Sequence, residues 1–442
     1  MLELIRGVHP PERKISKESA IKQAELPKKV VIPLSQHIGA PCKPIVKVGD
    51  EVKIGQTIAE SDAFCSAPIH ASISGKVTEI AKKPHPSMGD CMAIVIESNG
   101  RMIWDESIKA RENVDALSSK ELIDIVKQAG IVGMGGAMFP TFIKYCPPKG
   151  KKIDTIILNG AECEPMLTCD HRTMLKYPDD IVKGLKLIMK MAGAEEAIIG
   201  IEDNKPDAIK ILKERTAKEP AIKVVGLKTK YPQGAEKMLI YSLTKRKVPC
   251  ACLPLDVGIV VNNVGTAKAI HDAVYQMKPL IERVVTVTGD VKKPQNLLVK
   301  IGTSFSELIR QCDGFKGEPA KIINGGPMMG IAQATEDVPV IKGTSGILIQ
   351  NKKSLVEEEE RVCIRCGKCV QFCPMEIMPT TITNYAKHDL IDLAEESNAM
   401  DCIECGCCAY ECPSKIPLVH WIKYAKSEIS KKRAKEKEQK KK

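Results

Sequence analysis

Apolar and polar side chains alternate in short runs across residues 26–104. Residues 30–33, 43–50 and 69–78 follow this alternation, and Gly, Pro and Asp separate the runs. A period of two is typical of strands with one buried face. We therefore expect residues 26–104 to form an all-β domain.

The pattern changes to helices alternating with strands over residues 105–283. Residues 119–130 have apolar positions at helical spacing, a serine at the start and Gly130 at the end, as in an amphipathic helix. Apolar runs at 153–159 and 197–201 are typical of buried strands, and residues 206–214 of another helix. This alternation predicts an α/β domain.

Residues 284–355 return to a β-rich pattern. A strand at 284–291, a helix at 304–312 and a strand at 320–326 fit a β-grasp unit. We treat residues 1–25 as an N-terminal arm and Glu357 to Glu360 as an acidic linker. A helix from Leu418 to Ile429 is expected to lead into a basic tail within residues 417–442.

Two cysteine runs between residues 356 and 416 share the spacing C-x2-C-x2-C-x3-C-P. This spacing is that of ferredoxins with two [4Fe–4S] clusters, in which the fourth cysteine of each run ligates the other cluster. The predicted ligands are Cys363, Cys366, Cys369 and Cys412 for the first cluster, and Cys402, Cys405, Cys408 and Cys373 for the second. A pair of zinc sites is the alternative, although zinc usually takes two C-x2-C units and not four-cysteine runs that end in proline.

The remaining cysteines do not follow this spacing. Cys407 lies inside the second run and is not expected to be a ligand. We interpret most of the nine scattered cysteines as small buried apolar residues; they are Cys42, Cys65, Cys91, Cys146, Cys163, Cys169, Cys250, Cys252 and Cys312.

Composition narrows the class of protein. The net charge is +11, but residues 427–442 alone hold eight Lys or Arg against three Glu, which places much of the charge in a solvated tail. Aromatic residues make up only 4% of the chain, so nucleic-acid binding is disfavoured. No signal-peptide pattern and no apolar run of about 18 residues is present. We expect a chain without a transmembrane helix, in which the abundance of cysteine, 18 residues in all, indicates metal binding and not disulfides.

A glycine-rich loop follows the helix that ends at Gly130. It contains Gly133, Gly135, Gly136 and Phe139, and Lys144 comes shortly after it. Glycines let backbone N–H groups approach a phosphate closely, although such a loop can equally be a plain turn. The loop does not follow a strand, so it is not the G-x-G-x-x-G of a Rossmann fold.

Four segments occur in a suggestive order: the glycine loop, Asn159 to Pro165, Tyr231 to Glu236, and Asn262 to Thr266. This order resembles the NADH-binding flavoprotein subunit of respiratory complex I and its hydrogenase and formate dehydrogenase relatives. The resemblance implies a cofactor site for FMN and NAD(H) within these segments. Two positions depart from the family pattern, Ala161 and Ala235.

The resemblance also implies roles for individual residues. Gly133, Gly135 and Gly136 would contact the FMN phosphate and ribityl chain with Lys144 nearby, and Asn159, Asn262, Asn263 and Thr266 would contact the flavin. Glu164 and Glu236 would face NADH, and Phe139 would stack. Glu162, Tyr231 and Gly234 complete the implied cofactor-binding set.

The whole order of modules is similar to the C subunit of the Rnf ion-translocating complex, including the opening run from Gly7 to Lys14. The implied fold is multidomain: a barrel-sandwich hybrid at 26–104, a complex I flavoprotein-like α/β domain at 105–283, a β-grasp unit at 284–355 and a ferredoxin-like domain at 356–416. The barrel-sandwich resembles biotinyl and lipoyl domains but has no Met-Lys attachment pair, which favours a structural or docking role over that of a cofactor carrier.

The implied function is electron transfer between NADH, FMN and two [4Fe–4S] clusters, as part of an oxidoreductase that exchanges electrons with ferredoxin and moves Na⁺ or H⁺. The implied partners are the other membrane and iron–sulfur subunits, with ferredoxin as an indirect partner. The implied location is peripheral, at the cytoplasmic face of the cell membrane. No catalytic Ser, His or Cys is expected.

Two other functions share these features. A cobalamin reductase can combine the same flavin and iron–sulfur modules. A non-catalytic electron relay would keep the clusters without a working flavin site, and Ala161 and Ala235 are the residues that favour it.

Overall fold

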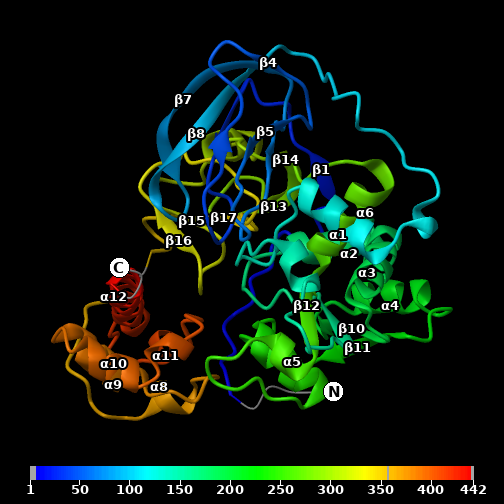
Figure 1. The fold of residues 1–442 in the computed structure, drawn as a ribbon. Helices are drawn as coiled ribbons and strands as arrows, with labels where there is room; N and C mark the ends of the chain where they lie inside the picture. Colours follow the sequence, from blue (N-terminus) through cyan, green and yellow to red (C-terminus); the bar gives the residue numbers. More distant parts are fainter. Residues whose placement is uncertain (1–5, 356–357, 440–442) are drawn as a thin grey trace.

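The computed structural model describes residues 6–355 and 358–439. Figure 1 shows the barrel-sandwich strands at the top, the α/β domain at the right and the ferredoxin-like domain at the lower left, with the β-grasp strands between them. Two of the expected segments, the start of the N-terminal arm and Glu357 of the acidic linker, lie outside the described residues.

The barrel-sandwich domain consists of two small sheets that enclose an apolar core. One sheet has the order β2-β8-β7-β4 and the other β3-β5-β6. The strands are β2 (Lys29–Pro33), β3 (Lys43–Pro44), β4 (Glu51–Val52), β5 (Thr57–Glu60), β6 (Ile69–His70), β7 (Gly75–His85) and β8 (Gly89–Ser98).

Two expected strands of this domain are wrong in extent. Only Lys43–Pro44 of residues 43–50 is extended into a ladder, and residues 69–78 are split between β6 and β7. The split occurs because β6 pairs in one sheet and β7 in the other, so the chain changes sheet between them.

The α/β domain is built on a parallel sheet of order β11-β10-β9-β12. Ile156 and Leu158 of β9 pack with α1, α3 and α6 on one face, and Ile157 packs with α5 on the other. Its elements are η1 (Val114–Ala116), α1 (Ser119–Gln128), η2 (Thr141–Tyr145), β9 (Thr155–Asn159), α2 (Cys169–Lys176), α3 (Pro178–Ala192), β10 (Glu196–Glu202), α4 (Pro206–Arg215), β11 (Ile222–Leu227), α5 (Glu236–Thr244), η3 (Pro254–Val257), β12 (Ile259–Asn263) and α6 (Val264–Gln276).

Helix α1 confirms the expected amphipathic helix, but its N-cap lies one residue earlier than expected. Ser118, and not Ser119, is the N-cap, because its side chain accepts a hydrogen bond from Glu121 N while the Glu121 carboxylate accepts one from Ser118 N. This reciprocal pair satisfies two backbone donors at the helix start.

The β-grasp domain has a mixed sheet of order β1-β14-β13-β17-β15-β16, with α7 packed against it. Its edge strand β1 comes from the N-terminal arm and pairs in parallel with β14, so part of the arm belongs to this sheet. The elements are β1 (Ile21–Gln23), β13 (Glu282–Gly289), β14 (Gln295–Lys300), α7 (Phe305–Gln311), β15 (Pro319–Asn324), β16 (Ile331–Gln333) and β17 (Gly346–Asn351).

The ferredoxin-like domain repeats one local motif. A glycine with positive φ, Gly367 or Gly406, precedes each of the short helices α8 and α11. The elements are α8 (Lys368–Gln371), α9 (Pro379–Lys387), α10 (Ile391–Glu396), η4 (Ala399–Asp401), α11 (Cys407–Tyr410) and α12 (Leu418–Gln439).

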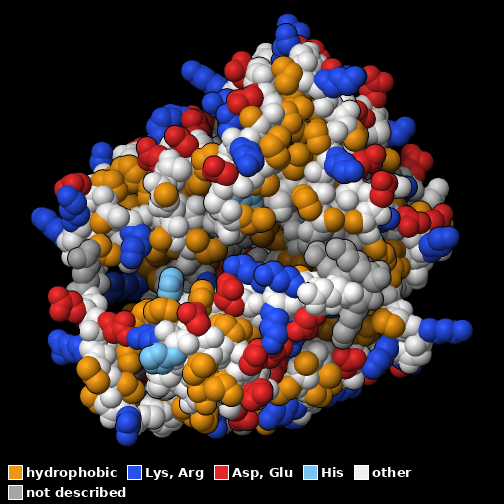
Figure 2. All heavy atoms as spheres, turned by 60° about the vertical axis from the view of Figure 1, so that its left-hand side comes forward, with side chains coloured by type: hydrophobic (Ala, Val, Ile, Leu, Met, Phe, Trp, Pro, Cys, Tyr) orange, Lys and Arg blue, Asp and Glu red, His pale blue; other side chains and the backbone are white. Residues whose placement is uncertain are grey.

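Helix α12 continues well past the expected end at Ile429. Lys432 pairs with Asp392, and Arg433 pairs with Glu395 on α10, so the first part of the basic tail is helical and ion-paired. Lys/Arg and Asp/Glu side chains are interspersed on the face drawn in Figure 2. No helix among the described residues is long and apolar enough to cross a membrane.

Candidate functional site

The carboxyl ends of β9 and β12 meet at the point where the strand order of the parallel sheet reverses. Strands β9, β10 and β11 proceed in one direction from the centre, whereas β12 lies on the other side of β9. Open α/β sheets bind ligands at such a switch point. Asn159 and Asn263 are paired in register there, so two of the predicted flavin residues stand side by side.

Three asparagines organise this edge of the sheet. Asn159 Nδ2 donates to Gly234 O at 2.8 Å, which joins the second predicted segment to the third. Asn263 Oδ1 caps α6 by accepting from Gly265 N at 2.8 Å, and its Nδ2 donates to Asp170 Oδ2 at 2.7 Å. Asn262 Oδ1 accepts from Tyr145 Oη at 3.1 Å.

The glycine loop is held closed at its base and open at its tip. Gly133 N donates to Phe139 O at 2.9 Å, and Met134 N donates to Thr266 Oγ1 at 3.0 Å. Gly135, Gly136 and Ala137 at the tip are exposed. Among the described residues, none accepts a hydrogen bond from the N–H groups of these three tip residues. Such a row of free amides is suited to an anionic group.

The acidic residues of the site have different surroundings. Glu162 caps α2 by accepting from Asp170 N at 2.7 Å and His171 N at 3.2 Å. Glu164 Oε1 accepts from Met328 N at 2.6 Å and Met329 N at 3.2 Å in the β-grasp domain, and burial raises the pKa of its carboxyl. Glu164 therefore joins two domains and does not stand free.

Lys144 and Glu236 line the wall of the site beyond the asparagines. Lys144 Nζ donates to Val261 O at 2.6 Å and lies 3.8 Å from Glu236 Oε1. Burial lowers the pKa of Lys144, and the nearby Glu236 opposes this effect. Phe139 is half-buried and has no ring partner among the described aromatic residues.

The donor set at this site fits FMN. Asn262 Nδ2 is a buried amide donor without a partner among the described residues, which is a costly state for a buried polar atom. The free amides at the loop tip are suited to a phosphate, and Asn262 Nδ2 is suited to a polar ring or chain. The structure thus brings the four predicted segments together around one edge of the sheet.

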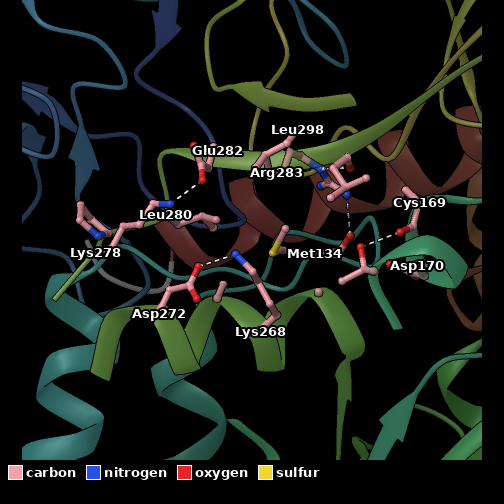
Figure 3. Close-up of a pocket in the computed structure, with 15 residues that line it drawn as sticks. Met134, Cys169, Asp170, Lys268, Asp272, Lys278, Leu280, Glu282, Arg283 and Leu298 are labelled. Atoms are coloured by element: carbon pink, nitrogen blue, oxygen red, sulfur yellow. Dashed lines mark hydrogen bonds and ion pairs between the residues drawn. The ribbon is translucent and has the colours of Figure 1, made fainter. Parts of the chain in front are cut away.

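Sequence reasoning missed several residues at this site, and Figure 3 shows two of them. Asp170 bonds to Asn263, and burial together with the Glu162 carboxylate raises the pKa of Asp170 to about 7. Arg283, on β13 of the β-grasp domain, points toward Met134 of the glycine loop. No local pattern could have identified Arg283, because it lies 149 residues from Met134.

The two cysteine runs lie in two loops around α8 and α11. Cys373, Cys402, Cys405 and Cys408 line one hollow, and Cys369 packs against an apolar cluster that contains both Cys408 and Cys412. Cys363 and Cys366 are exposed. Cys407 is fully buried against Val8 and Tyr231, apart from the hollow.

The second cysteine loop lies against the α/β domain. Tyr231 Oη donates to Cys405 O at 2.7 Å, and burial raises the pKa of this hydroxyl, which keeps it protonated as a donor. Ala251 N also donates to Asp401 Oδ1 at 3.1 Å. Tyr231 is one of the predicted cofactor residues, so the flavin-type segments and the cluster loop share a contact.

The expectation that most scattered cysteines are buried is wrong. Cys42, Cys169 and Cys312 are buried, but Cys146 and Cys250 are exposed, and the other four are partly exposed. Cys146 and Cys250 lie in surface loops and not in a core.

Four known domain families match successive parts of the chain. Residues 2–101 match the RnfC barrel sandwich hybrid domain, and residues 126–272 match the Nuo51 FMN-binding domain. Residues 284–332 match the SLBB domain, and residues 355–413 match the 4Fe-4S dicluster domain. These matches confirm the predicted fold class and the FMN and iron–sulfur cofactors.

Solved structures also share part of the fold. A chain of the NAD⁺-reducing [NiFe]-hydrogenase in its H₂-reduced state superposes with a TM-score of 0.51 at 19% identity, over 68% of this chain and 61% of that one. This likeness concerns the fold alone.

Curated relatives match nearly the whole chain. The C subunit of the proton-translocating ferredoxin:NAD(+) oxidoreductase complex of Clostridium ljungdahlii is 54% identical over 97% of this chain and 94% of its own length. The C subunit of the Na(+)-translocating complex of Acetobacterium woodii is 48% identical over 96% of both chains. The C subunit of the ion-translocating oxidoreductase complex of Rhodobacter capsulatus is 40% identical over 84% of this chain and 73% of its own length. With this identity across its full set of modules, the chain belongs to the family of C subunits of the Rnf ion-translocating ferredoxin:NAD⁺ oxidoreductase complexes.

Proposed function

We propose that this chain is the NADH-linked subunit of an ion-translocating ferredoxin:NAD⁺ oxidoreductase complex. It carries electrons between NADH, FMN and two [4Fe–4S] clusters, and the other subunits move the ion. The relatives named above are subunits of such complexes, one described as proton-translocating and one as Na⁺-translocating.

The observation that carries the proposal is the contact between Tyr231 and Cys405. It joins a segment of the flavin-type site to a cysteine loop of the cluster type through a 2.7 Å hydrogen bond. Val8, Cys163 and Met328 pack around the same contact, so no solvent layer separates the two sites there. Such a junction serves electron transfer between neighbouring groups.

FMN, when bound, accepts two electrons as a hydride and releases them one at a time. The chain's own residues bind and orient it. The free amides of Gly135 and Gly136 would hold the phosphate, and Asn262 Nδ2 would donate to the flavin. Hydride chemistry of this kind would need no acid–base pair from the chain.

The cluster ligands are proposed to cross between the two runs. Cys363, Cys366, Cys369 and Cys412 would bind the first cluster, and Cys402, Cys405, Cys408 and Cys373 the second. The shared hollow of Cys373 with Cys402, Cys405 and Cys408 supports this crossing.

The two clusters have different places on the electron path. The second would lie next to the flavin site, because its loop carries Cys405, whose carbonyl accepts from Tyr231. The first would lie at the surface, where Cys363 and Cys366 are exposed and Val362 is 87% exposed. The second cluster would therefore exchange electrons with the flavin, and the first with the partners of the chain.

The chain is peripheral in its complex, and we place it on the cytoplasmic face of the membrane. NADH is a cytoplasmic reductant, so the face that carries the flavin site must be open to that compartment. Other subunits of the complex would hold the chain at the membrane.

The test is an anaerobic preparation of the chain reconstituted with iron, sulfide and FMN. We expect one FMN and about eight iron atoms per chain, from the pattern of two four-iron clusters, and bleaching of both chromophores on addition of NADH. Full iron content without FMN binding and without a response to NADH would establish an electron relay instead. If the chain purifies without membrane subunits and reduces cobalamin, it is a cobalamin reductase instead.

A further inference from the structure

We propose that the β-grasp domain positions the flavin loop from outside the α/β domain. Two buried basic side chains of the β-grasp domain, Lys342 and Arg283, hold backbone carbonyl groups at the two ends of one side of the flavin loop. We define the flavin loop as residues 131–140. The proposal rests on the proposed function, because it concerns how this chain prepares the loop for FMN.

Lys342 holds the root of the flavin loop. Its side chain is almost completely buried, and its Nζ donates to Gly130 O at 2.6 Å and to Pro68 O at 2.8 Å. Gly130 follows α1 and leads directly into the loop. A Cβ added at Gly130 would lie 2.2 Å from Pro68 O and 2.8 Å from Lys342 Nζ, so only glycine allows this three-domain contact.

Arg283 reaches the other end of the same loop strand. Its guanidinium is buried, with Nη1 donating to Lys342 O at 2.5 Å and Nη2 lying 3.5 Å from Met134 O, at the outer limit of a hydrogen bond. Figure 3 shows the Arg283 side chain extending from β13 toward Met134. The two basic residues are therefore linked to each other as well as to the loop.

The return strand of the flavin loop is held as well. Ile38 N of the barrel-sandwich domain donates to Met138 O at 3.2 Å. A Cβ added at Gly343, the residue after Lys342, would lie 2.5 Å from Met138 Cγ, so the β-grasp backbone presses closely on this side chain. Between these fixed points only the tip, at Gly135 to Ala137, is exposed.

Fixing both strands of the loop serves binding in two ways. Glycine-rich segments lose much conformational entropy when they are ordered, so holding the loop in advance reduces the cost of ordering it around FMN. The buried Arg283 guanidinium also favours an anionic group nearby, because charge interactions are strong where water is excluded. Lys342 and Arg283 are thus positioning residues for the flavin.

The experiment compares Lys342→Met with the wild-type full-length chain. Met keeps the long apolar stem and removes the donors that reach Gly130 O and Pro68 O. We expect FMN to bind about tenfold more weakly, the size of one lost hydrogen bond at the upper end of the usual range. In the apo chain, hydrogen exchange should become faster in the peptide covering residues 131–140 while iron content stays unchanged.

Lys300→Met is the matched control. Lys300 is a buried lysine of the same sheet, but it pairs with Glu282 and makes no hydrogen bond to the described residues of the flavin loop. It should leave loop exchange and FMN affinity near the wild-type values. Equal weakening in both variants, or unchanged loop exchange in Lys342→Met, would overturn the proposal.

Two further measurements keep the test decisive. If Lys342→Met does not fold, Arg283→Gln tests the second contact with the same two readouts. If the wild-type chain binds no FMN, the proposed function fails, whereas the exchange of the loop in the apo chain still decides whether the β-grasp domain holds it.

Discussion

Tyr231 shows how one residue can belong to two sites. Its position in the third flavin-type segment is visible in the sequence, but its hydroxyl partner, Cys405 O, lies 174 residues away. Asp170 is the opposite case, because nothing in its local sequence marks it, although it bonds to the predicted Asn263. At the scale of residues, the sequence motifs indicate which segments form the site, and the tertiary packing decides which residues form hydrogen bonds.

Replacing Tyr231 with Phe removes the hydroxyl that donates to Cys405 O. We expect a stability loss of about 1 kcal/mol, typical for one hydrogen bond, and a lower reduction potential for the second cluster, because a donor near the cluster favours its reduced form. An EPR-monitored redox titration measures this shift. Tyr424→Phe, which removes a surface hydroxyl bonded to Asp389 at 2.7 Å, is the control and should leave both potentials unchanged.

From the raised pKa of Asp170 we predict that flavin binding depends on pH. Burial and the Glu162 carboxylate raise the pKa of Asp170 to about 7, so its carboxyl is neutral below pH 7 and anionic above it. The added negative charge near Asn263 should weaken binding of the FMN phosphate as the pH rises through 7, by about tenfold for one nearby charge.

Flavin fluorescence titrations between pH 6 and 8 measure this change. Asp170→Asn should bind FMN with the same affinity across the range. The free energy of unfolding should also decrease as the pH rises. The folded state holds the proton of Asp170 more tightly than the unfolded state, so the contribution of Asp170 to stability decreases from about pH 4 to 7. A wild-type affinity that rises with pH would contradict the assignment.

At the scale of elements, α8 and α11 repeat one motif, in which a glycine with positive φ precedes a short helix. Two cysteines at α8 have different surroundings. Cys369 lies on α8 and packs against the apolar cluster that contains Cys408 and Cys412, whereas Cys373, just after α8, lines the hollow with Cys402 and Cys405. Helix α12 extends further than the sequence predicts. It continues to Gln439 because Lys432 and Arg433 find carboxylates on α10, a pairing that the expectation of a solvated tail did not include.

Two serine variants around α8 test the crossing of ligands. Cys373→Ser should damage the second cluster, although the residue belongs to the first run, and Cys369→Ser should damage the first. EPR spectra of the reduced proteins distinguish the two clusters, and iron analysis should show a loss of up to about four iron atoms in each variant, the content of one cluster. Loss of the same cluster in both variants would exclude the crossing.

At the scale of the whole molecule, the N-terminal arm connects the α/β domain with the β-grasp domain. Val8 forms a bridge with Tyr231 of the α/β domain, and β1 extends the β-grasp sheet. Between them, Lys14 Nζ donates to the carbonyls of Glu162, Glu164 and Leu167 at 2.9, 3.1 and 2.7 Å. The arm therefore holds the second flavin-type segment in place.

Lys14→Met should loosen that segment. We expect a stability loss of about 2 kcal/mol, in the range of hydrogen bonds from a charged donor, and weaker FMN binding because Glu162 and Glu164 lose their support. Thermal unfolding and FMN titration measure the two effects. Lys17→Met is the matched control on the same arm, since the Lys17 side chain is 60% exposed and its Nζ lies 4.0 Å from Glu18 Oε1. An equal loss of stability in that variant would contradict the role of Lys14.

The cysteine spacing, the order of the four flavin-type segments and the sequence of modules could all be identified from the sequence alone. The cysteine spacing is local, because ligands that share one short loop lie close together along the chain, and the order of segments and modules is identified by its resemblance to known families. Only the tertiary structure shows three other features. These are the contacts of Lys342 and Arg283 with the flavin loop and its root, the hydrogen bond of Tyr231 to Cys405, and the course of the N-terminal arm. Lys342 and Gly130 are 212 residues apart, and only the packing of three domains determines which buried carbonyl a buried lysine reaches.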